Sequence, residues 1–311
     1  MSAPSESSWR AWGQTLRLSL APSAAADAAV GALIGAAAWP AGVAPWLAIG
    51  ASLLVYHGGM ALNDWADREE DARVRPSRPI PSGRVRPASV LVVAMGLLLA
   101  GPLLLASVVP SAGLVLGGVS LAAALYDLAG RGDLRGPFLL ALCRFGNLTS
   151  GLIVGAETAG LELGARHLAL PIVYAAYVFV LSVLGRREDD LNREPGRLPS
   201  HVLHLASACL VAAPIAGAVG TAALEPTSPY LPGGLALAIW AALGLQRAAA
   251  RAGDWPREDV VGVMGLLLRR LLIVTASAAL ASGTRAGLLV APTVLLGYWV
   301  SHRLRRVFPP S

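Results

Sequence analysis

Ten apolar segments, each long enough to cross a lipid bilayer, fill most of this 311-residue chain. We place them at residues 15–38, 44–66, 88–108, 111–128, 134–157, 168–186, 201–224, 231–250, 258–282 and 286–304. Only 14% of the residues are charged, whereas an ordinary soluble domain carries about 25%. The polar stretches between the segments are too short to fold alone. The sequence therefore predicts an all-α membrane protein, a polytopic bundle of nine to ten spans that forms a single domain over residues 1–311, with a polar N-terminal lead at 1–14.

The positions of the arginines predict the orientation of this bundle. All 25 basic residues are arginine, and most lie in connections on the same side as the N-terminus. The opposite connections contain only Arg166 and Arg285. Because cytoplasmic loops are enriched in positive charge, we expect an even number of helices in a bacterial-type cell membrane, with both termini and the acidic motifs in the cytoplasm. The pI near 10 could indicate nucleic acid, but scattered loop arginines indicate the lipid bilayer as partner, and we expect no nucleic acid.

Three further arginines lie deep inside apolar segments, away from the segment ends. Arg269 and Arg270 interrupt the segment at 258–282, so we expect this helix to be the weakest span, bent or partly interfacial. Arg144 shares its segment with Asn147, and Asp27 lies near the middle of the first segment. An unpaired charge inside a membrane is costly, so these groups either serve a function or form an Asp27–Arg144 ion pair that holds two helices together.

The connection after the second apolar segment is densely acidic. It reads Asn63-Asp64-Trp65-Ala66-Asp67-Arg68-Glu69-Glu70-Asp71. On a continuous helix, Asn63, Asp64, Asp67 and Asp71 would share one face, within about 100° of arc. Carboxylates this close to hydrocarbon would repel one another and resist desolvation unless cations lay among them. Oxygen ligands without His or Cys favour Mg²⁺, which could in turn hold a phosphorylated ligand.

Arginines and a proline-rich turn follow the acidic connection. After Arg73, Arg75 and Arg78 the chain reads Pro79-Ile80-Pro81-Ser82-Gly83-Arg84, which predicts a defined loop. Arginine forks beside metal-bound carboxylates are suited to clamping a diphosphate. The alternative is a solvated loop that only fixes the topology. We favour the ligand site because the aligned acids stand beside the arginines.

These two stretches together resemble the first signature of the UbiA-type intramembrane prenyltransferases. The matching residues are Asn63-Asp64-x-x-Asp67-x-x-x-Asp71 and Arg78-Pro79-x-Pro81-Ser82-Gly83, after the second apolar segment as in that family. The resemblance implies a helical bundle around a central cavity open to lipid. It also implies a Mg²⁺-dependent enzyme that binds an isoprenoid diphosphate and transfers its prenyl group to a lipophilic, often aromatic, acceptor.

The resemblance places a second acidic motif after the sixth apolar segment. Asp190 and Glu194 share a helical face there, as a DxxxE form of the family pattern. The leading Asp of that pattern falls on Arg186, which leaves fewer certain metal ligands, with Glu188 or Asp189 as substitutes. The alternative is a charged helix end without ligands.

A third family pattern, Tyr-x-x-x-Lys, falls on the fourth connection. Tyr126 matches, but Gly130 stands at the Lys position and Arg131 follows it. Arg131 could supply the missing positive charge to the diphosphate, although its register differs.

Three aromatic or imidazole side chains inside the segments are also candidates. His57 lies on the same stripe as Asp64, two turns deeper, and is either a cavity residue or a packed core histidine. Tyr174 and Tyr177 are either cavity or core residues.

The sequence thus supports one main hypothesis. We expect metal ligands at Asn63, Asp64, Asp67, Asp71, Asp190 and Glu194, of which the aspartates are catalytic. We expect substrate contacts from Asn63, Arg78, Tyr126, Arg131, Asn147 and Glu194. Three alternatives stay open. One is transfer of a phosphorylated sugar to polyprenyl phosphate on the same scaffold, and another is a membrane transporter that uses the carboxylates as an ion site. The third is a degenerate, non-catalytic scaffold, because two of the motifs deviate from the family pattern. Against the transporter, the acids gather at one membrane face rather than at the midplane.

Overall fold

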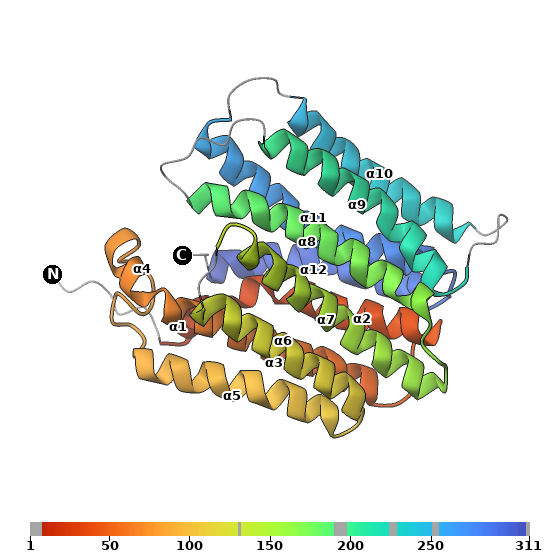
Figure 1. Ribbon diagram of the computed structural model, residues 1–311, viewed down its shortest axis with the longest axis horizontal. Coiled ribbons are helices and arrows are strands. Elements are labelled where there is room, and N and C mark those ends of the chain that lie inside the picture. The colour runs from red at the N-terminus through yellow and green to blue at the C-terminus, as the bar shows by residue number, and fades with distance from the viewer. Residues whose placement is uncertain (1–7, 130–131, 190–197, 224–228, 251–254, 309–311) are drawn as a thin grey trace.

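The computed structural model describes residues 8–129, 132–189, 198–223, 229–250 and 255–308, and within these ranges every regular element is a helix. Ten of the helices are long and run back and forth through one bundle (Figure 1). They are α2 (Ala21–Ala36), α3 (Ala44–Ala66), α5 (Pro87–Ala106), α6 (Pro110–Leu128), α7 (Arg135–Ala159), α8 (Ala169–Asp189), α9 (Leu198–Gly220), α10 (Tyr230–Ala249), α11 (Arg257–Ala281) and α12 (Gly287–Val307). Shorter helices are α1 (Ser8–Thr15), α4 (Arg68–Val74) and 3-10 turns at Leu18–Leu20 and Ala165–Leu168. The prediction of an all-α bundle is confirmed.

The helix bounds follow the predicted segments closely. The first segment is shorter than expected, because α2 begins at Ala21 with Pro22 in its first turn, after the 3-10 turn. The segment at 258–282 forms one continuous α-helix, so Arg269 and Arg270 do not break it. Eight helices of the described residues are long and apolar enough to cross a membrane. α10 and α12 lie outside that set, although they have 20 and 21 residues.

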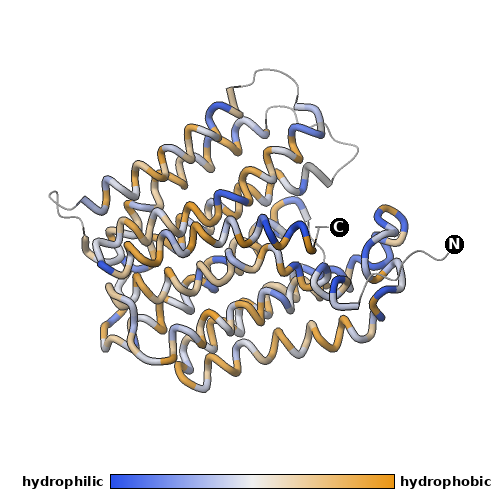
Figure 2. The backbone as a smooth tube through the Cα atoms, turned by 180° about the vertical axis from the view of Figure 1, so that it is seen from behind, coloured by the Kyte–Doolittle hydropathy of each residue, from blue (hydrophilic) through white to orange (hydrophobic). Residues whose placement is uncertain are grey.

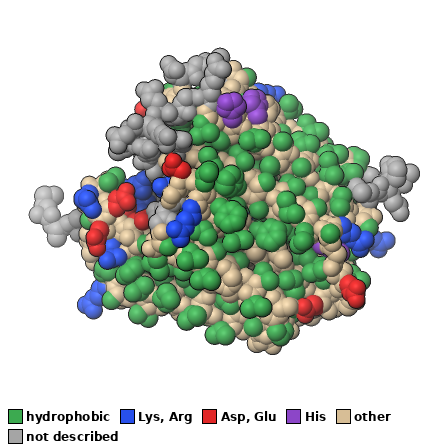
Figure 3. Space-filling view, viewed as in Figure 1, with side chains coloured by type: hydrophobic (Ala, Val, Ile, Leu, Met, Phe, Trp, Pro, Cys, Tyr) green, Lys and Arg blue, Asp and Glu red, His purple; other side chains and the backbone are tan. Residues whose placement is uncertain are grey.

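The outer surface of the bundle is apolar. Large hydrophobic side chains that face outward include Val92, Leu103, Leu114 and Leu289, which are 72%, 69%, 79% and 73% exposed. Figure 3 shows apolar side chains over the middle of one face and charged side chains towards its two ends. The backbone view from behind gives the same pattern, with apolar helices and a polar region around α4 (Figure 2). Soluble monomers rarely expose so large an apolar surface, so the chain is an integral membrane protein.

α2 lies at the centre of the bundle, where it contacts α3, α7, α11 and α12. One apolar core is formed by α2 together with the six helices from α7 to α12. A second core lies mainly among α3, α5 and α6. The C-terminal ends of α3 and α12 and the N-terminal end of α2 lie at the end of the bundle that carries α4 (Figure 1). This end therefore gathers the acidic connection, the N-terminal arginines and the C-terminal arginines.

Glycines allow α2 and α7 to pack backbone against backbone. A Cβ at Gly31 would lie 2.9 Å from the Leu152 nitrogen, and one at Gly151 would lie 2.9 Å from the Ala28 Cα. Gly35 and Gly155 repeat the contact one turn further on. Such small-residue stripes let membrane helices approach closely. The contact fixes the register of α2 against α7, and therefore the positions of the polar side chains one turn earlier on each helix.

Candidate functional site

The first acidic segment bends at Asp67, where α3 ends and α4 begins. Helical hydrogen bonding almost continues through the bend, since the Asp67 N–H donates to the Asn63 carbonyl (3.0 Å) and the Asp71 N–H to the Asp67 carbonyl (2.8 Å). Asp64 and Asp71 are both 4% exposed and lie on the inner side, whereas Glu69 and Glu70 face outward. The prediction of a shared face is therefore met for Asp64 and Asp71, although the helix is not continuous.

Two arginines bind these buried carboxylates. Arg78 Nη1 lies 2.6 Å from Asp71 Oδ2 and 3.9 Å from Asp64 Oδ1. Arg17, which precedes the first span, places its Nη2 3.2 Å from Asp64 Oδ1. Arg78 is itself only 6% exposed. These ion pairs provide the counter-charge that buried carboxylates require, and they hold the Arg78 guanidinium in a fixed place.

The proline-rich turn after Arg78 forms the defined loop that its sequence predicts. The Ser82 hydroxyl donates to the Arg78 carbonyl (2.7 Å), and the Val85 N–H donates to the Pro79 carbonyl (3.1 Å). Gly83 has a φ of 74°, a left-handed conformation that glycine adopts without strain. The loop therefore presents Arg78 from a rigid backbone.

Asn63 points in another direction, toward α6. Its Nδ2 donates to Asp127 Oδ1 at 2.9 Å. Asn63, Asp127 and Tyr126 line one end of a cavity of about 220 Å³. Cavity residues come from α2, α3, α6, α7, α8 and α11. Their apolar members dominate: Val55, Met60, Val119, Ala123, Leu140, Val178, Leu181, Leu268 and Leu271. The cavity thus combines an apolar body with a polar end.

The polar groups predicted inside the spans form one network on the wall of this cavity. Arg144 Nη1 lies 2.7 Å from Asp27 Oδ2. Asn147 Nδ2 donates to the same Asp27 oxygen (3.2 Å), and Arg144 Nη2 donates to the Ser23 hydroxyl (3.1 Å). The ion pair between α2 and α7, one of the two interpretations of these charges, is therefore present. Arg144 and Asn147 also line the cavity, so the network is in place to contact a ligand.

The two tyrosines of α8 belong to the packed interior, and His57 is half-buried and hydrogen-bonded to the backbone. His57 Nδ1 lies 2.7 Å from the Leu16 carbonyl oxygen. Tyr174 and Tyr177 are fully buried, and the Tyr177 hydroxyl donates to the Leu267 carbonyl (2.7 Å). The structure thus favours the core interpretation for all three.

Arg131, Asp190 and Glu194 lie outside the described residues, as does Gly130. α8, which leads into the second acidic motif, lines the cavity through Val178, Leu181 and Ser182. It ends at the same end of the bundle as α3 and α6 (Figure 1).

Metal ligands are only partly assembled by the described residues. Among them, no three His, Cys, Asp or Glu side chains are grouped to hold a metal ion. Asp64 and Asp71 bind arginines, and Asn63 binds Asp127. The available atoms are nevertheless carboxylate and amide oxygens, the donors that suit Mg²⁺.

The sequence reasoning missed two site residues. Asp127 follows Tyr126 directly, yet its pairing with Asn63 joins positions 64 residues apart and leaves no local pattern. Arg17 is one of the arginines on the N-terminal side that predict the orientation, and the structure shows that it also binds Asp64. An acid at the end of an apolar segment was the available signal for Asp127.

Comparison with known proteins gives a consistent result. The model of the UbiA prenyltransferase family matches residues 28–259. A digeranylgeranylglyceryl phosphate synthase of Ignicoccus hospitalis is 30% identical over 254 residues, which cover 74% of this chain and 82% of that relative. One of Methanothrix thermoacetophila is 50% identical over 60 residues, 19% of this chain and 22% of the relative. The structure of a UbiA homolog from Archaeoglobus fulgidus bound to GPP and Mg²⁺ has a TM-score of 0.62 and 16% identity, covering 91% of this chain and 99% of that one.

Proposed function

The chain belongs to the UbiA prenyltransferase family, and from this premise we propose that it transfers a prenyl group from an isoprenoid diphosphate to a lipophilic acceptor inside the membrane. The observation that carries the proposal is the cavity of about 220 Å³, apolar along its body and polar at the end near the acidic segment. A prenyl diphosphate has the same division, with a hydrocarbon chain and a charged head.

The polar end of the cavity is the place for the diphosphate. Asn63 and Asp127 line it, and Asp67 follows on the same segment as Asn63. Together with Asp71 and the proposed ligands Asp190 and Glu194, these oxygens would hold Mg²⁺. The choice of metal is supported by the A. fulgidus homolog, which is bound to GPP and Mg²⁺. When bound, Mg²⁺ supplies Lewis-acid stabilisation of the leaving diphosphate.

The other residues of the site have separate roles in this proposal. Arg78, fixed by Asp64 and Asp71, contributes positive charge beside the departing pyrophosphate. The apolar wall, including Val119, Leu181 and Leu271, keeps water away from the allylic carbon, where water would otherwise capture the cation. The acceptor then attacks that carbon and loses a proton, and pyrophosphate leaves.

The proposed orientation places both termini and the acidic segment in the cytoplasm. The arginine distribution supports this arrangement, because the arginines just before α2 and those in the last turns of α12 lie at the end of the bundle that carries α4. The diphosphate would then enter from the cytoplasm and the prenyl chain from the bilayer.

Asp67→Ala tests the proposal, with Glu70→Ala as the matched control. Both residues lie in the acidic segment, but Glu70 faces outward. The protein would be reconstituted in liposomes with Mg²⁺, a panel of labelled prenyl diphosphates and a membrane lipid extract. We expect pyrophosphate release and a prenylated lipid, identified by mass, with a loss of roughly a hundredfold or more in Asp67→Ala and none in Glu70→Ala.

Three outcomes would contradict the proposal. Full turnover of Asp67→Ala, with normal insertion, would remove this segment from the site. Turnover of phosphoribosyl diphosphate, but of no prenyl diphosphate, would indicate transfer of a phosphorylated sugar. Ion flux through the liposomes without pyrophosphate release would indicate a transporter.

A further inference from the structure

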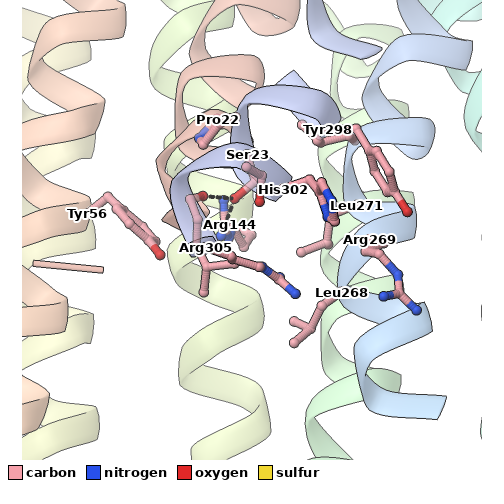
Figure 4. A pocket seen from close by; sticks show the side chains of 13 residues that line it. Pro22, Ser23, Tyr56, Arg144, Leu268, Arg269, Leu271, Tyr298, His302 and Arg305 are labelled. Carbon is pink, nitrogen blue, oxygen red and sulfur yellow. Dashed lines mark hydrogen bonds between the residues drawn. The ribbon is translucent and has the colours of Figure 1, made fainter. Parts of the chain in front are cut away.

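A second, smaller cavity adjoins the large one near the start of α2 and the end of α12. It measures about 100 Å³. The two cavities share Tyr56, Arg144, Leu268 and Leu271 as lining residues, so they meet at one wall. Figure 4 shows the side chains that line the smaller cavity, with Arg144 near the centre of the view. Arg305 comes from α12 and Arg269 from α11.

The lining of this small cavity is basic and contains no acidic side chain. Arg144, Arg269, Arg305 and His302 line it, together with the hydroxyl-bearing Ser23, Tyr56, Tyr298 and Ser301. Arg144 is neutralised by Asp27. Within the part of the chain that the structure describes, no carboxylate forms an ion pair with Arg269 or Arg305. The cavity therefore carries two positive charges that no carboxylate of the described residues balances.

Arg305 differs from the other arginines at the end of α12. Arg303 and Arg306 are exposed, and Arg303 lies over the Trp299 ring at 4.8 Å, which suits a charge that marks the cytoplasmic end of a span. Arg305 is partly buried, and its Nε is fully buried without a hydrogen-bond partner among the described residues. Leaving a buried donor of a charged group unsatisfied is costly. An anion in the cavity would remove that cost.

We propose, on the basis of the proposed function, that this cavity binds the phosphate headgroup of a phosphorylated lipid acceptor. A phosphate monoester carries a charge of about −1.5 to −2 at neutral pH, which matches the two uncompensated arginines. Guanidinium groups are the preferred partners of phosphate oxygens. The volume suits a small headgroup, and the large cavity next to it, which shares Leu268 and Leu271, offers apolar lining for the hydrocarbon part of the acceptor.

The donor diphosphate has a different place in the molecule. Asn63 and Asp127 line the large cavity and not the small one, and Arg78 and Asp71 line neither. The residues of the small cavity instead come from the start of α2 and from α3, α7, α11 and α12. Two anions can therefore be held at once, one in each cavity, on either side of the wall that the cavities share, as a reaction between two phosphorylated lipids requires.

The experiment compares two probes that differ only in the phosphate. An alkylglycerol phosphate and the matching uncharged alkylglycerol would be titrated into the protein in nanodiscs, with binding followed by native mass spectrometry. We expect the phosphorylated probe to bind at least about tenfold more tightly. Arg305→Gln and Arg269→Gln should each remove most of that preference, whereas Arg303→Gln on the same helix should keep it. Binding of geranyl diphosphate with Mg²⁺ should be unchanged in all three variants.

Each other outcome has a definite meaning. Equal binding of the two probes to the unchanged protein would overturn the inference without any variant. Competition by inorganic phosphate as strong as that of the lipid phosphate would show a site for the free anion instead. Loss of geranyl diphosphate binding in Arg305→Gln would assign the cavity to the donor. Failure of the unchanged protein to bind geranyl diphosphate would count against the proposed prenyl transfer, while the headgroup preference could still be measured.

Discussion

The ion pair between Asp27 and Arg144 allows a sharp test of how α2 and α7 are held together. Asp27 is fully buried, and its Oδ2 receives hydrogen bonds from Arg144 (2.7 Å) and Asn147 (3.2 Å). Asp27 Oδ1 has no partner among the described residues. Arg144→Gln removes the only cation that contacts this carboxylate in the described part of the chain.

The size of the effect follows from these contacts. Removing one partner of a buried ion pair typically costs about 3–5 kcal/mol. The hydrogen bond from Asn147 remains and contributes about 1 kcal/mol, so we expect Arg144→Gln to lower the free energy of unfolding by about 3 kcal/mol. That change corresponds to roughly a hundredfold shift in the unfolding equilibrium.

A double-mutant cycle separates the pair from the individual side chains. Asp27→Asn combined with Arg144→Gln leaves two neutral amides, so we expect the double variant to regain at least about 2 kcal/mol relative to additive single effects. Unfolding would be followed by tryptophan fluorescence in mixed micelles at increasing SDS. Arg166→Gln, in an exposed connection, serves as the control and should be within about 0.5 kcal/mol of the unchanged protein.

Additive losses in that cycle would refute the reasoning. They would mean that Asp27 and Arg144 stabilise the bundle separately and that the observed ion pair adds nothing. A loss below about 1 kcal/mol in Arg144→Gln would show that Asp27 is not held as a buried carboxylate that needs its counter-ion.

Two further predictions concern packing and metal. Gly151→Ala should destabilise the bundle by about 1–3 kcal/mol in the same unfolding assay, because its Cβ would overlap the Ala28 backbone. Gly96→Ala, with open space at the Cβ position, should be neutral or stabilising by up to about 1 kcal/mol, and equal effects of the two substitutions would contradict the close-packing argument. Chelation with EDTA should abolish binding of geranyl diphosphate, and added Mg²⁺ should restore it; binding that survives chelation would argue against a metal-held diphosphate.

The helices could be predicted from the sequence because hydropathy and length are local properties. The segments at 44–66 and 258–282 differ from α3 and α11 by at most one residue at either end. The first acidic segment was also readable, since Asp64 and Asp71 are close in the chain and both meet Arg78. The exact shape of this segment could not be predicted, because the bend at Asp67 depends on packing at the end of the bundle.

Contacts between distant helices could be predicted only as alternatives. The Asp27–Arg144 pair was one of two interpretations, because nothing in the sequence shows that α2 contacts α7. The close approach of the glycines of these two helices is seen only in the structure. The Asn63–Asp127 contact had no signal beyond two polar residues at the ends of separate segments. The small basic cavity had none at all, since Arg269 and Arg305 look like a span defect and a topology charge.

The distribution of partners among the arginines connects the fold to the two proposed ligands. Arg17, Arg78 and Arg144 each bind a buried carboxylate, so the structure itself balances their charge. Ion pairs of this kind keep polar groups fixed beside an apolar cavity without a ligand. Arg269 and Arg305 have no such carboxylate in the described residues, although both lie in a bundle that is apolar outside and close-packed within. The proposed lipid phosphate would supply these two half-buried arginines with the counter-charge that no carboxylate of the described residues supplies.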